Sequence, residues 1–190
     1  MSPDRTSGGL LAVANDLRRS AAERDPWVAG LRLVGIGWGT VELERAAEEL
    51  GNAFAAARLP SPDWAPATRD AHLGASAWIG ATGWFGAEGA PRGLDAPEMP
   101  AVVLLEPDTE GRLAATLARF DEGVAAIYLA APDDDAPRDA AAAATSPYPF
   151  DAARVGAPAP GPLGAGQMVL ARPTWGPHII VVMAPAPATR

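Results

Sequence analysis

Residues 102–130 read VVLLEPDTEGRLAATLARFDEGVAAIYLA, and this stretch contains the clearest pattern in the chain. It begins and ends with short apolar runs rich in valine, isoleucine and leucine, which are typical of buried strands. Between these runs Leu113, Leu117 and Phe120 recur at three- and four-residue spacing, which predicts a helix with one apolar face. The stretch therefore predicts a strand, a helix and a strand, at residues 101–107, 109–120 and 124–130.

The flanking sequence adds two helices and several strands to this centre. Apolar residues at helical spacing predict the helices, at residues 10–24 and 41–59. Compact apolar runs predict the strands, at residues 31–38, 73–80, 167–173 and 178–184. Prolines and glycines predict loops after the second helix and at residues 80–100 and 156–166. The helices are few and each precedes a group of strands, which favours an α+β domain with a mixed sheet.

Composition excludes several classes of function. The chain has 190 residues, a net charge of -8 and no cysteine. No basic stripe is available to neutralise phosphates, which disfavours nucleic-acid binding, and the lack of cysteine removes disulfides and thiolate metal sites. No apolar run approaches the ~18 residues that cross a membrane, and the N-terminus lacks a secretory pattern. We therefore expect a cytoplasmic protein with no nucleic-acid or membrane partner.

The spacing of three glycines suggests a nucleotide-binding turn. Gly35, Gly37 and Gly39 stand between a predicted strand and a predicted helix, where a dinucleotide-binding turn would place them. That fingerprint needs a further glycine or alanine at the position of Thr40, and an acidic residue at the end of a second buried strand. Neither requirement is met. Close packing against one face of a strand explains the three glycines better.

The titratable residues form no obvious site in the sequence. His72 and His178 are the only histidines, and neither has a serine or carboxylate at a spacing that suggests a catalytic relay. The acidic run 133–135 lacks the alternating ligands and final glutamate of a calcium loop, which favours a solvated loop.

Six tryptophans are many for a chain of this length. Trp38 and Trp78 fall within predicted strands and suit a core. Trp84 and Trp175 fall in or beside Gly- and Pro-rich loops, where an aromatic side chain more often contacts a ligand or a partner.

The central stretch resembles the middle of vicinal-oxygen-chelate proteins, the superfamily with the glyoxalase and bleomycin-resistance fold. It is most similar to methylmalonyl-CoA epimerases, in which a strand ending in LLEP leads through a helix into a Gly-Glu-Gly-X-His-His-Ile strand. The corresponding residues 121–127 read DEGVAAI. Residues 34–50, VGIGWGTVELERAAEEL, are similar to the family's opening strand and helix, and residues 168–184, MVLARPTWGPHIIVVMA, to its closing hairpin.

This resemblance implies two βαβββ modules that form a cup-shaped mixed sheet. It covers most of residues 31–184, with module one at about 31–107 and module two at about 108–184. An N-terminal tail and extra helix (1–30) and a C-terminal tail (185–190) lie outside it. Because members of the superfamily commonly pair, the resemblance also implies a homodimer.

The resemblance breaks down at the metal site. In the family two histidines and two glutamates, one on each of four strands, hold the metal. The corresponding positions are Gly35, Val103, Ala126 and Val181, and none of these side chains can ligate a metal. The sequence therefore implies a member of the fold with no metal and no other cofactor.

Strand alternation indicates what lines the cup instead. The residues in phase with the lost ligands are apolar, with one phenol among them. Such a surface suits a small apolar or aromatic molecule that is held mainly by burial. Together with the two loop tryptophans, the predicted ligand-binding residues are Gly35, Gly37, Val103, Leu105, Ala126, Tyr128, Val181, Trp84 and Trp175.

Three functions stay open at this point. The first is metal-free binding of a small apolar molecule in the cup. The second is a cofactor-independent isomerase, lyase or cyclase that uses the same cup and moves a proton through a side chain. Its candidate catalytic residues are Tyr128, His178, Glu106 and Arg172. The third is an inert structural or interaction protein whose own side chains fill the cup.

Overall fold

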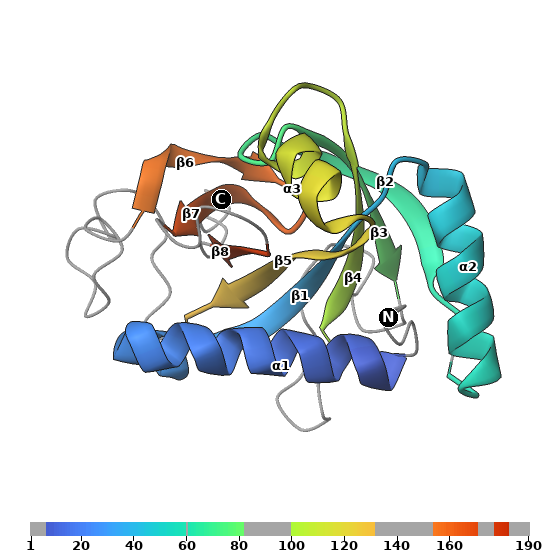
Figure 1. The fold of residues 1–190 in the computed structure, drawn as a ribbon, viewed down its shortest axis with the longest axis horizontal. Helices are drawn as coiled ribbons and strands as arrows, with labels where there is room; N and C mark the ends of the chain where they lie inside the picture. The colour runs from blue at the N-terminus through green and yellow to red at the C-terminus, as the bar shows by residue number, and fades with distance from the viewer. Residues whose placement is uncertain (1–6, 60, 82–99, 132–153, 171–176, 183–190) are drawn as a thin grey trace, which may run out of the picture.

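The computed structural model describes residues 7–59, 61–81, 100–131, 154–170 and 177–182 (Figure 1). Within these ranges lie three α-helices and a short 3-10 helix: α1 (Ser7–Arg24), η1 (Pro26–Gly30), α2 (Leu43–Ala56) and α3 (Arg112–Phe120). The strands are β1 (Arg32–Gly39), β2 (Asp63–Asp70), β3 (Ala75–Ala81), β4 (Ala101–Pro107), β5 (Gly123–Ala130), β6 (Arg154–Gly161), β7 (Gly164–Leu170) and β8 (His178–Val182).

All eight strands belong to one mixed sheet, in the order β2-β3-β4-β1-β5-β8-β7-β6. The two halves of the sheet repeat each other, because β1 runs parallel to β4 and β5 runs parallel to β8. The halves join at the centre through β1 and β5, which are antiparallel with Ile36 opposite Ile127. The predicted α+β class with a cup-shaped mixed sheet is confirmed.

The two edge strands were not predicted, because both contain prolines. β2 includes Pro66, and β6 includes Pro158 and Pro160. Proline has no N–H to donate, which rules it out of a central strand. An edge strand pairs on one side only, so the missing donor can face the open side. In the sheet β2 pairs with β3 alone and β6 with β7 alone.

The sheet curls until these two edges approach each other. The Ala71 N–H, just after β2, donates to the Pro160 carbonyl of β6 at 3.4 Å. The ring Nε2 of His72 lies 2.7 Å from the Gln167 carbonyl of β7. The two outer hairpins therefore meet, and the curled sheet forms a half-barrel with a convex and a concave face.

Helices α1 and α2 cover the convex face. Leu10 of α1 and the buried Leu50 and Phe54 of α2 belong to one apolar cluster with Ile36 and Trp38 of β1. Figure 1 shows α1 lying along one side of the sheet, with α3 on the opposite side. The N-terminal helix, which lies outside the family resemblance, is therefore part of the core.

The concave face carries a second apolar cluster, to which α3 contributes Leu113 and Leu117. Its strand residues come from β3, β4, β5, β7 and β8 and are Ala75, Ala77, Val103, Leu105, Ala125, Ala126, Tyr128, Val169, Ile180 and Val182. The three glycines of β1 alternate with Ile36 and Trp38, so they lie on this face. Their position agrees with the predicted strand phase.

Side chains of the concave cluster occupy the space beside these glycines. A Cβ atom built on Gly35 would lie 2.5 Å from Leu163 Cδ1, and one built on Gly37 would lie 2.9 Å from Leu105 Cδ1 and 3.0 Å from Ala126 Cβ. The glycines therefore allow the close packing against one face of the strand that the sequence predicts. They let the Tyr128 ring, whose Cε2 is 3.3 Å from the Gly37 site, and its neighbours lie close to the sheet.

We expect Gly37→Ala to lower the free energy of unfolding by about 1–3 kcal/mol, because the new methyl would overpack a buried strand contact. Gly51→Ala is the matched control. Gly51 is in α2 and its Cβ would meet nothing within 4 Å, so alanine should raise stability by about 0.5–1 kcal/mol through helix propensity. Urea unfolding of the three proteins measures both effects, and equal responses of the two variants would contradict the packing argument.

Candidate functional site

Most of the predicted lining residues do lie together on the concave face. Gly35 and Gly37 of β1 face Tyr128, and Val103, Leu105 and Ala126 belong to the same apolar cluster as Tyr128. Tyr128 is fully buried. The structure therefore brings six of the predicted residues to one surface.

Val181 lies on the opposite face, so its predicted place in the cup is wrong. It packs in the convex cluster with α1 and α2. β8 pairs with β5 in the register Ala126 to His178 and Tyr128 to Ile180, and neighbours in register share a face. The concave positions of β8 are therefore His178, Ile180 and Val182, one residue out of phase with the expectation.

Glu106 also lies away from the concave face. It follows Leu105 on β4 and therefore shares the face of Leu104, which packs in the convex cluster. Burial raises the pKa of Glu106, and the negative charges of Glu44 and Glu42 near α2 raise it further. Its predicted role as an acid or base in the cup is therefore wrong, because the side chain is on the other face of the sheet. Trp84, Trp175 and Arg172 lie outside the described residues.

A carboxylate that the sequence analysis missed contacts the predicted phenol. Asp70, at the end of β2, has no exposed surface, and its Oδ2 accepts a hydrogen bond of 3.1 Å from the Tyr128 hydroxyl. Its Oδ1 accepts the N–H groups of His72 and Leu73 at 3.1 and 3.0 Å. Asp70 therefore fixes the turn after β2 and reaches Tyr128 from the other half of the sheet.

Burial controls the protonation of this pair. Desolvation raises the pKa of Asp70 and outweighs the hydrogen bonds from Leu73 and Tyr128, which lower it. Desolvation also raises the pKa of Tyr128 well above its usual value, and the charge of Asp70 adds to that effect. The phenol thus stays protonated at neutral pH and donates to a carboxylate that burial destabilises in its charged form. Such a pair is suited to holding or passing one proton.

Gln167 is the second buried polar residue beside this turn. It is on β7 in register with Val182, which places its side chain on the concave face. It has no exposed surface, and among the residues that the structure describes neither its Oε1 nor its Nε2 has a hydrogen-bond partner. No sequence pattern marks Gln167, because its burial depends on where β7 meets β6 and β8.

His178 opens β8 on the concave face, near α3 rather than near Asp70. Its Nε2 lies 3.2 Å from the Thr116 hydroxyl, and only 2% of its surface is exposed. Burial, with the positive charge of Arg112, lowers its pKa to about 4. The imidazole is therefore neutral at neutral pH, and among the described residues no hydrogen bond joins it to the Asp70–Tyr128 pair.

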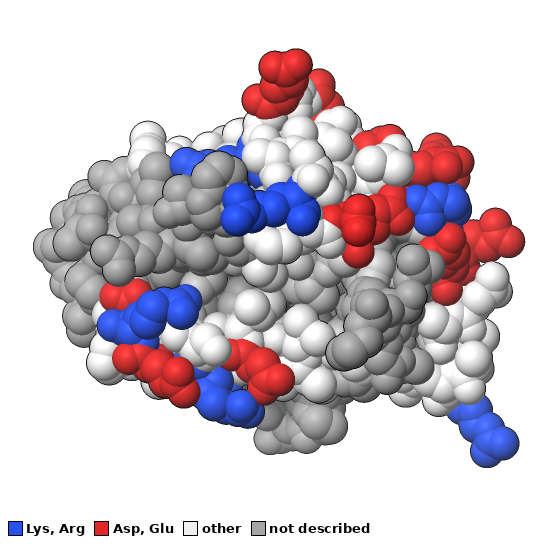
Figure 2. All heavy atoms as spheres, in the orientation of Figure 1, with Lys and Arg blue, Asp and Glu red and all other residues white. Residues whose placement is uncertain are grey.

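Charged side chains are distributed unevenly over the face of the molecule drawn in Figure 2. Figure 2 shows acidic side chains gathered around α2, while arginines and acids are interspersed along α1. In the described ranges no three histidines, aspartates or glutamates gather in a group that could hold a metal ion. None of the helices in the described part of the chain is long and apolar enough to cross a membrane.

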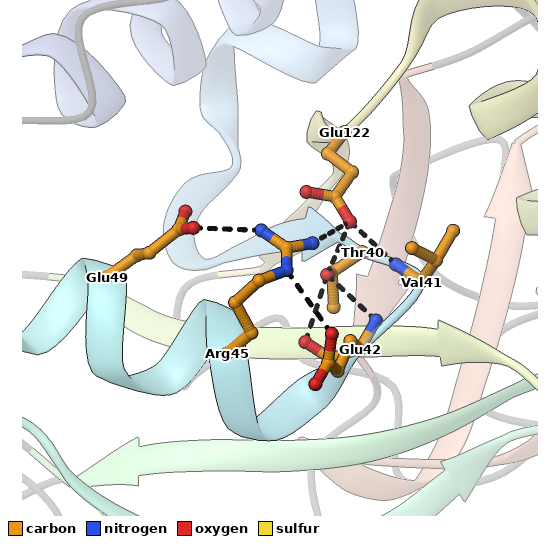
Figure 3. Close-up of polar contacts among 6 residues, drawn as sticks. All are labelled: Thr40, Val41, Glu42, Arg45, Glu49 and Glu122. Carbon is orange, nitrogen blue, oxygen red and sulfur yellow. Dashed lines mark hydrogen bonds and ion pairs between the residues drawn. The ribbon is translucent and has the colours of Figure 1, made fainter.

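A second polar cluster ties the two halves of the sheet together (Figure 3). Glu122, just before β5, accepts the Thr40 hydroxyl at 2.8 Å and the Val41 N–H at 2.9 Å, and it pairs with Arg45 of α2. Partial burial raises the pKa of Glu122, but these donors, Arg45 foremost, lower it to about 2. Thr40 therefore serves as a structural donor at the position where a nucleotide-binding turn would need glycine.

The fold itself is shared with known structures. A Streptomyces coelicolor methylmalonyl-CoA epimerase variant in complex with 2-nitronate-propionyl-CoA is 18% identical, with 80% of this chain and 98% of that chain covered and a TM-score of 0.50. A methylmalonyl-CoA epimerase in complex with methylmalonyl-CoA and NH4+ is 17% identical (83% and 99% covered, TM-score 0.52). The Mycobacterium tuberculosis methylmalonyl-CoA epimerase is 15% identical (82% and 88%, TM-score 0.53).

No protein-family model matches the sequence, and no curated protein sequence matches it. At these identities the structural likeness shows the fold alone. It agrees with the curled mixed sheet that the sequence resemblance implied.

We expect Glu122→Gln to lower the free energy of unfolding by about 1–2 kcal/mol at pH 7, because the amide loses the charge that the three donors stabilise. The folded-state pKa of about 2 lies below the ordinary 4.5, so the carboxylate's contribution is present above pH 4.5 and is lost as the pH falls toward 2. The difference between native and variant proteins should shrink over that interval. Glu49→Gln, which breaks an exposed pair with Arg45, should cost about 0.5 kcal/mol or less.

Two substitutions of Asp70 separate its charge from its hydrogen bonds. Its raised pKa means that stability is fullest below the ordinary 3.8 and is lost as the pH rises through the folded-state value. Asp70→Asn keeps an acceptor for the turn and removes the buried charge, so at pH 7 it should be at least as stable as the native protein. Asp70→Ala should lose about 1–3 kcal/mol, because two N–H groups lose their acceptor. Equal losses in both variants, measured by urea unfolding, would show that the charge stabilises the fold.

Proposed function

We propose that the protein binds a small apolar or aromatic molecule on the concave face, without a metal. The observation that carries this proposal is the chemistry of that face. Five strands, β3, β4, β5, β7 and β8, present a set of buried apolar side chains, interrupted by a few buried polar groups near one turn. Small-molecule sites in proteins have this composition, in which apolar walls supply affinity and a few polar groups fix orientation.

The metal-free character rests on the donors available. The concave positions of β1, β4, β5 and β8 are mainly glycine, alanine, valine, leucine and isoleucine, and His178 already lies against Thr116. Tyr128 is engaged with Asp70. A single imidazole beside α3 does not match the four-ligand set that the superfamily resemblance implies. The described residues of this face therefore do not fit a divalent cation, and no step of the proposed function depends on one.

Burial sets the affinity to expect. A two-ring hydrocarbon that buries about 250 Å² gains about 6 kcal/mol at 25 cal/mol per Å². The ligand loses translational and rotational freedom when it binds, and this loss offsets part of that gain. Dissociation constants in the upper micromolar to millimolar range are therefore expected for simple apolar probes.

A cofactor-independent isomerase, lyase or cyclase is the alternative, and the Asp70–Tyr128 pair favours it. A buried carboxylate that accepts from a phenol could take a proton from a bound substrate while the phenol gives one. This alternative needs a substrate within reach of both groups. Of the four candidate residues, Tyr128 alone is in the pair.

The inert alternative also has an observation in its favour. Leu163, Leu105 and Tyr128 occupy the space beside the β1 glycines, so the protein's own side chains fill that part of the concave face. Binding then requires these side chains to yield to the ligand. Homodimer formation and a cytoplasmic location stay predictions.

Methyl NMR with indane as the apolar probe distinguishes binding from the inert alternative. We expect saturable shifts for the methyl groups of Val103, Leu105 and Ile180 on the concave face. The methyl groups of Leu104 and Val181 lie on the same two strands, and those of Ile127 on the neighbouring β5, but all three residues face α1 and α2, so they serve as internal controls and should not shift. No saturable shift, or equal shifts on both faces, would favour the inert alternative. Elemental analysis of the same sample should find no stoichiometric metal.

A further inference from the structure

The side-chain amide of Gln167 is buried without a hydrogen-bond partner in the described ranges. Its backbone has a clear structural role, since the carbonyl lies 2.7 Å from His72 Nε2 and the residue pairs with Ala159 and Val182. Its side chain has no such role, because both polar atoms lack partners among the described residues. Burial in this state is unfavourable, because each unsatisfied group has lost its hydrogen bonds to water and gained none in return.

Glycine on the neighbouring strand makes room for this amide. A Cβ atom built on Gly161 of β6 would collide with Gln167 Oε1 and lie 2.5 Å from its Cδ. A side chain at position 161 would therefore exclude the present position of the glutamine. Gln167 of β7 and Gly161 of β6 are thus both needed to hold an unsatisfied amide on the concave face.

The surroundings disfavour a charged ligand at this amide. The buried polar and charged residues of the described ranges include one carboxylate and no arginine: Thr40, Asp70, Thr116, Gln167 and His178. An anion would have no buried cation to pair with and would meet the charge of Asp70. A cation would find Asp70 with both oxygens already accepting hydrogen bonds. A neutral ligand avoids both penalties.

We propose that Gln167 recognises an uncharged ligand that presents a hydrogen-bond donor and acceptor side by side, as the cis amide of a lactam or a primary carboxamide does. The glutamine N–H donates to the ligand carbonyl, and the glutamine carbonyl accepts the ligand N–H. The rest of the ligand is apolar and packs on the concave cluster. This inference rests on the proposed function, because it names the ligand class for the same site.

Calorimetric titration with matched ring compounds tests the inference. Oxindole carries the lactam, indane is the hydrocarbon of the same shape, and indane carboxylate and aminoindane carry the two charges. Pyrrolidinone and cyclopentane repeat the comparison with one ring. We expect oxindole to bind at least about tenfold more tightly than indane, because two buried hydrogen bonds replace two unsatisfied groups. Both charged compounds should bind more weakly than oxindole.

Gln167→Met supplies the variant, because methionine has a similar length and no unsatisfied amide. The preference for oxindole over indane should fall to about threefold or less, because methionine offers no amide for the lactam to pair with. The variant should also unfold at a higher urea concentration, which separates loss of recognition from loss of folding. Gln167→Leu repeats the test with a different shape.

The outcomes separate this inference from the proposed function. Suppose that indane binds, but that neither oxindole nor pyrrolidinone binds more tightly than the hydrocarbon of the same shape. The inference is then overturned and the proposed function stands. An advantage of oxindole that persists in both variants, or tighter binding of a charged compound, also overturns the inference. If none of the six compounds binds, the proposed function fails together with it.

Discussion

The close approach of the Tyr128 ring to the glycines of β1 is the contact on which the centre of this structure depends. β1 and β5 are the two strands that join the halves of the sheet, so any distortion there is transmitted to both halves. Alternating glycines remove the side chains from one face of β1, and Tyr128, Leu105 and Leu163 fill that space. On the other face Ile36 and Trp38 bind the sheet to the helices. β1 therefore separates the core beneath α1 and α2 from the concave core, to which α3 contributes.

The meeting of the outer hairpins gives the concave face its polar character. The contact between the turn after β2 and strands β6 and β7 encloses Asp70 and Gln167, which come from opposite edges of the sheet. Enclosure strengthens each hydrogen bond inside and raises the free-energy cost of each polar group left unpaired, because water no longer competes for it. Asp70 meets this demand through three hydrogen bonds, whereas the amide of Gln167 does not. That contrast makes the region a candidate for recognition as well as for packing.

The sequence analysis succeeded where a pattern had a single local cause. The apolar runs of β4, β5 and β8 and the helical spacing of α2 and α3 appear at the expected places, and the superfamily resemblance anticipated the topology. It failed at β2 and β6, since prolines predict loops unless the strand is known to be an edge. It also misplaced Val181 and Glu106, because an all-apolar or mostly buried strand does not reveal which residues face which side.

By itself, then, the sequence determined the class of fold, the central strand–helix–strand unit and the glycine face of β1, each of which follows from side-chain size and spacing along the chain. Tertiary structure decided the rest. It set which residues of β8 face the concave side, and it placed the proline-containing β2 and β6 at the two edges of the sheet. It also brought Asp70 to Tyr128, which is 58 residues away in the chain. The physical reason is that burial and hydrogen-bond partners depend on which segments the curled sheet brings together. Gln167 is an ordinary polar residue in the chain, and only its place between β6 and β8 leaves its amide buried and unsatisfied.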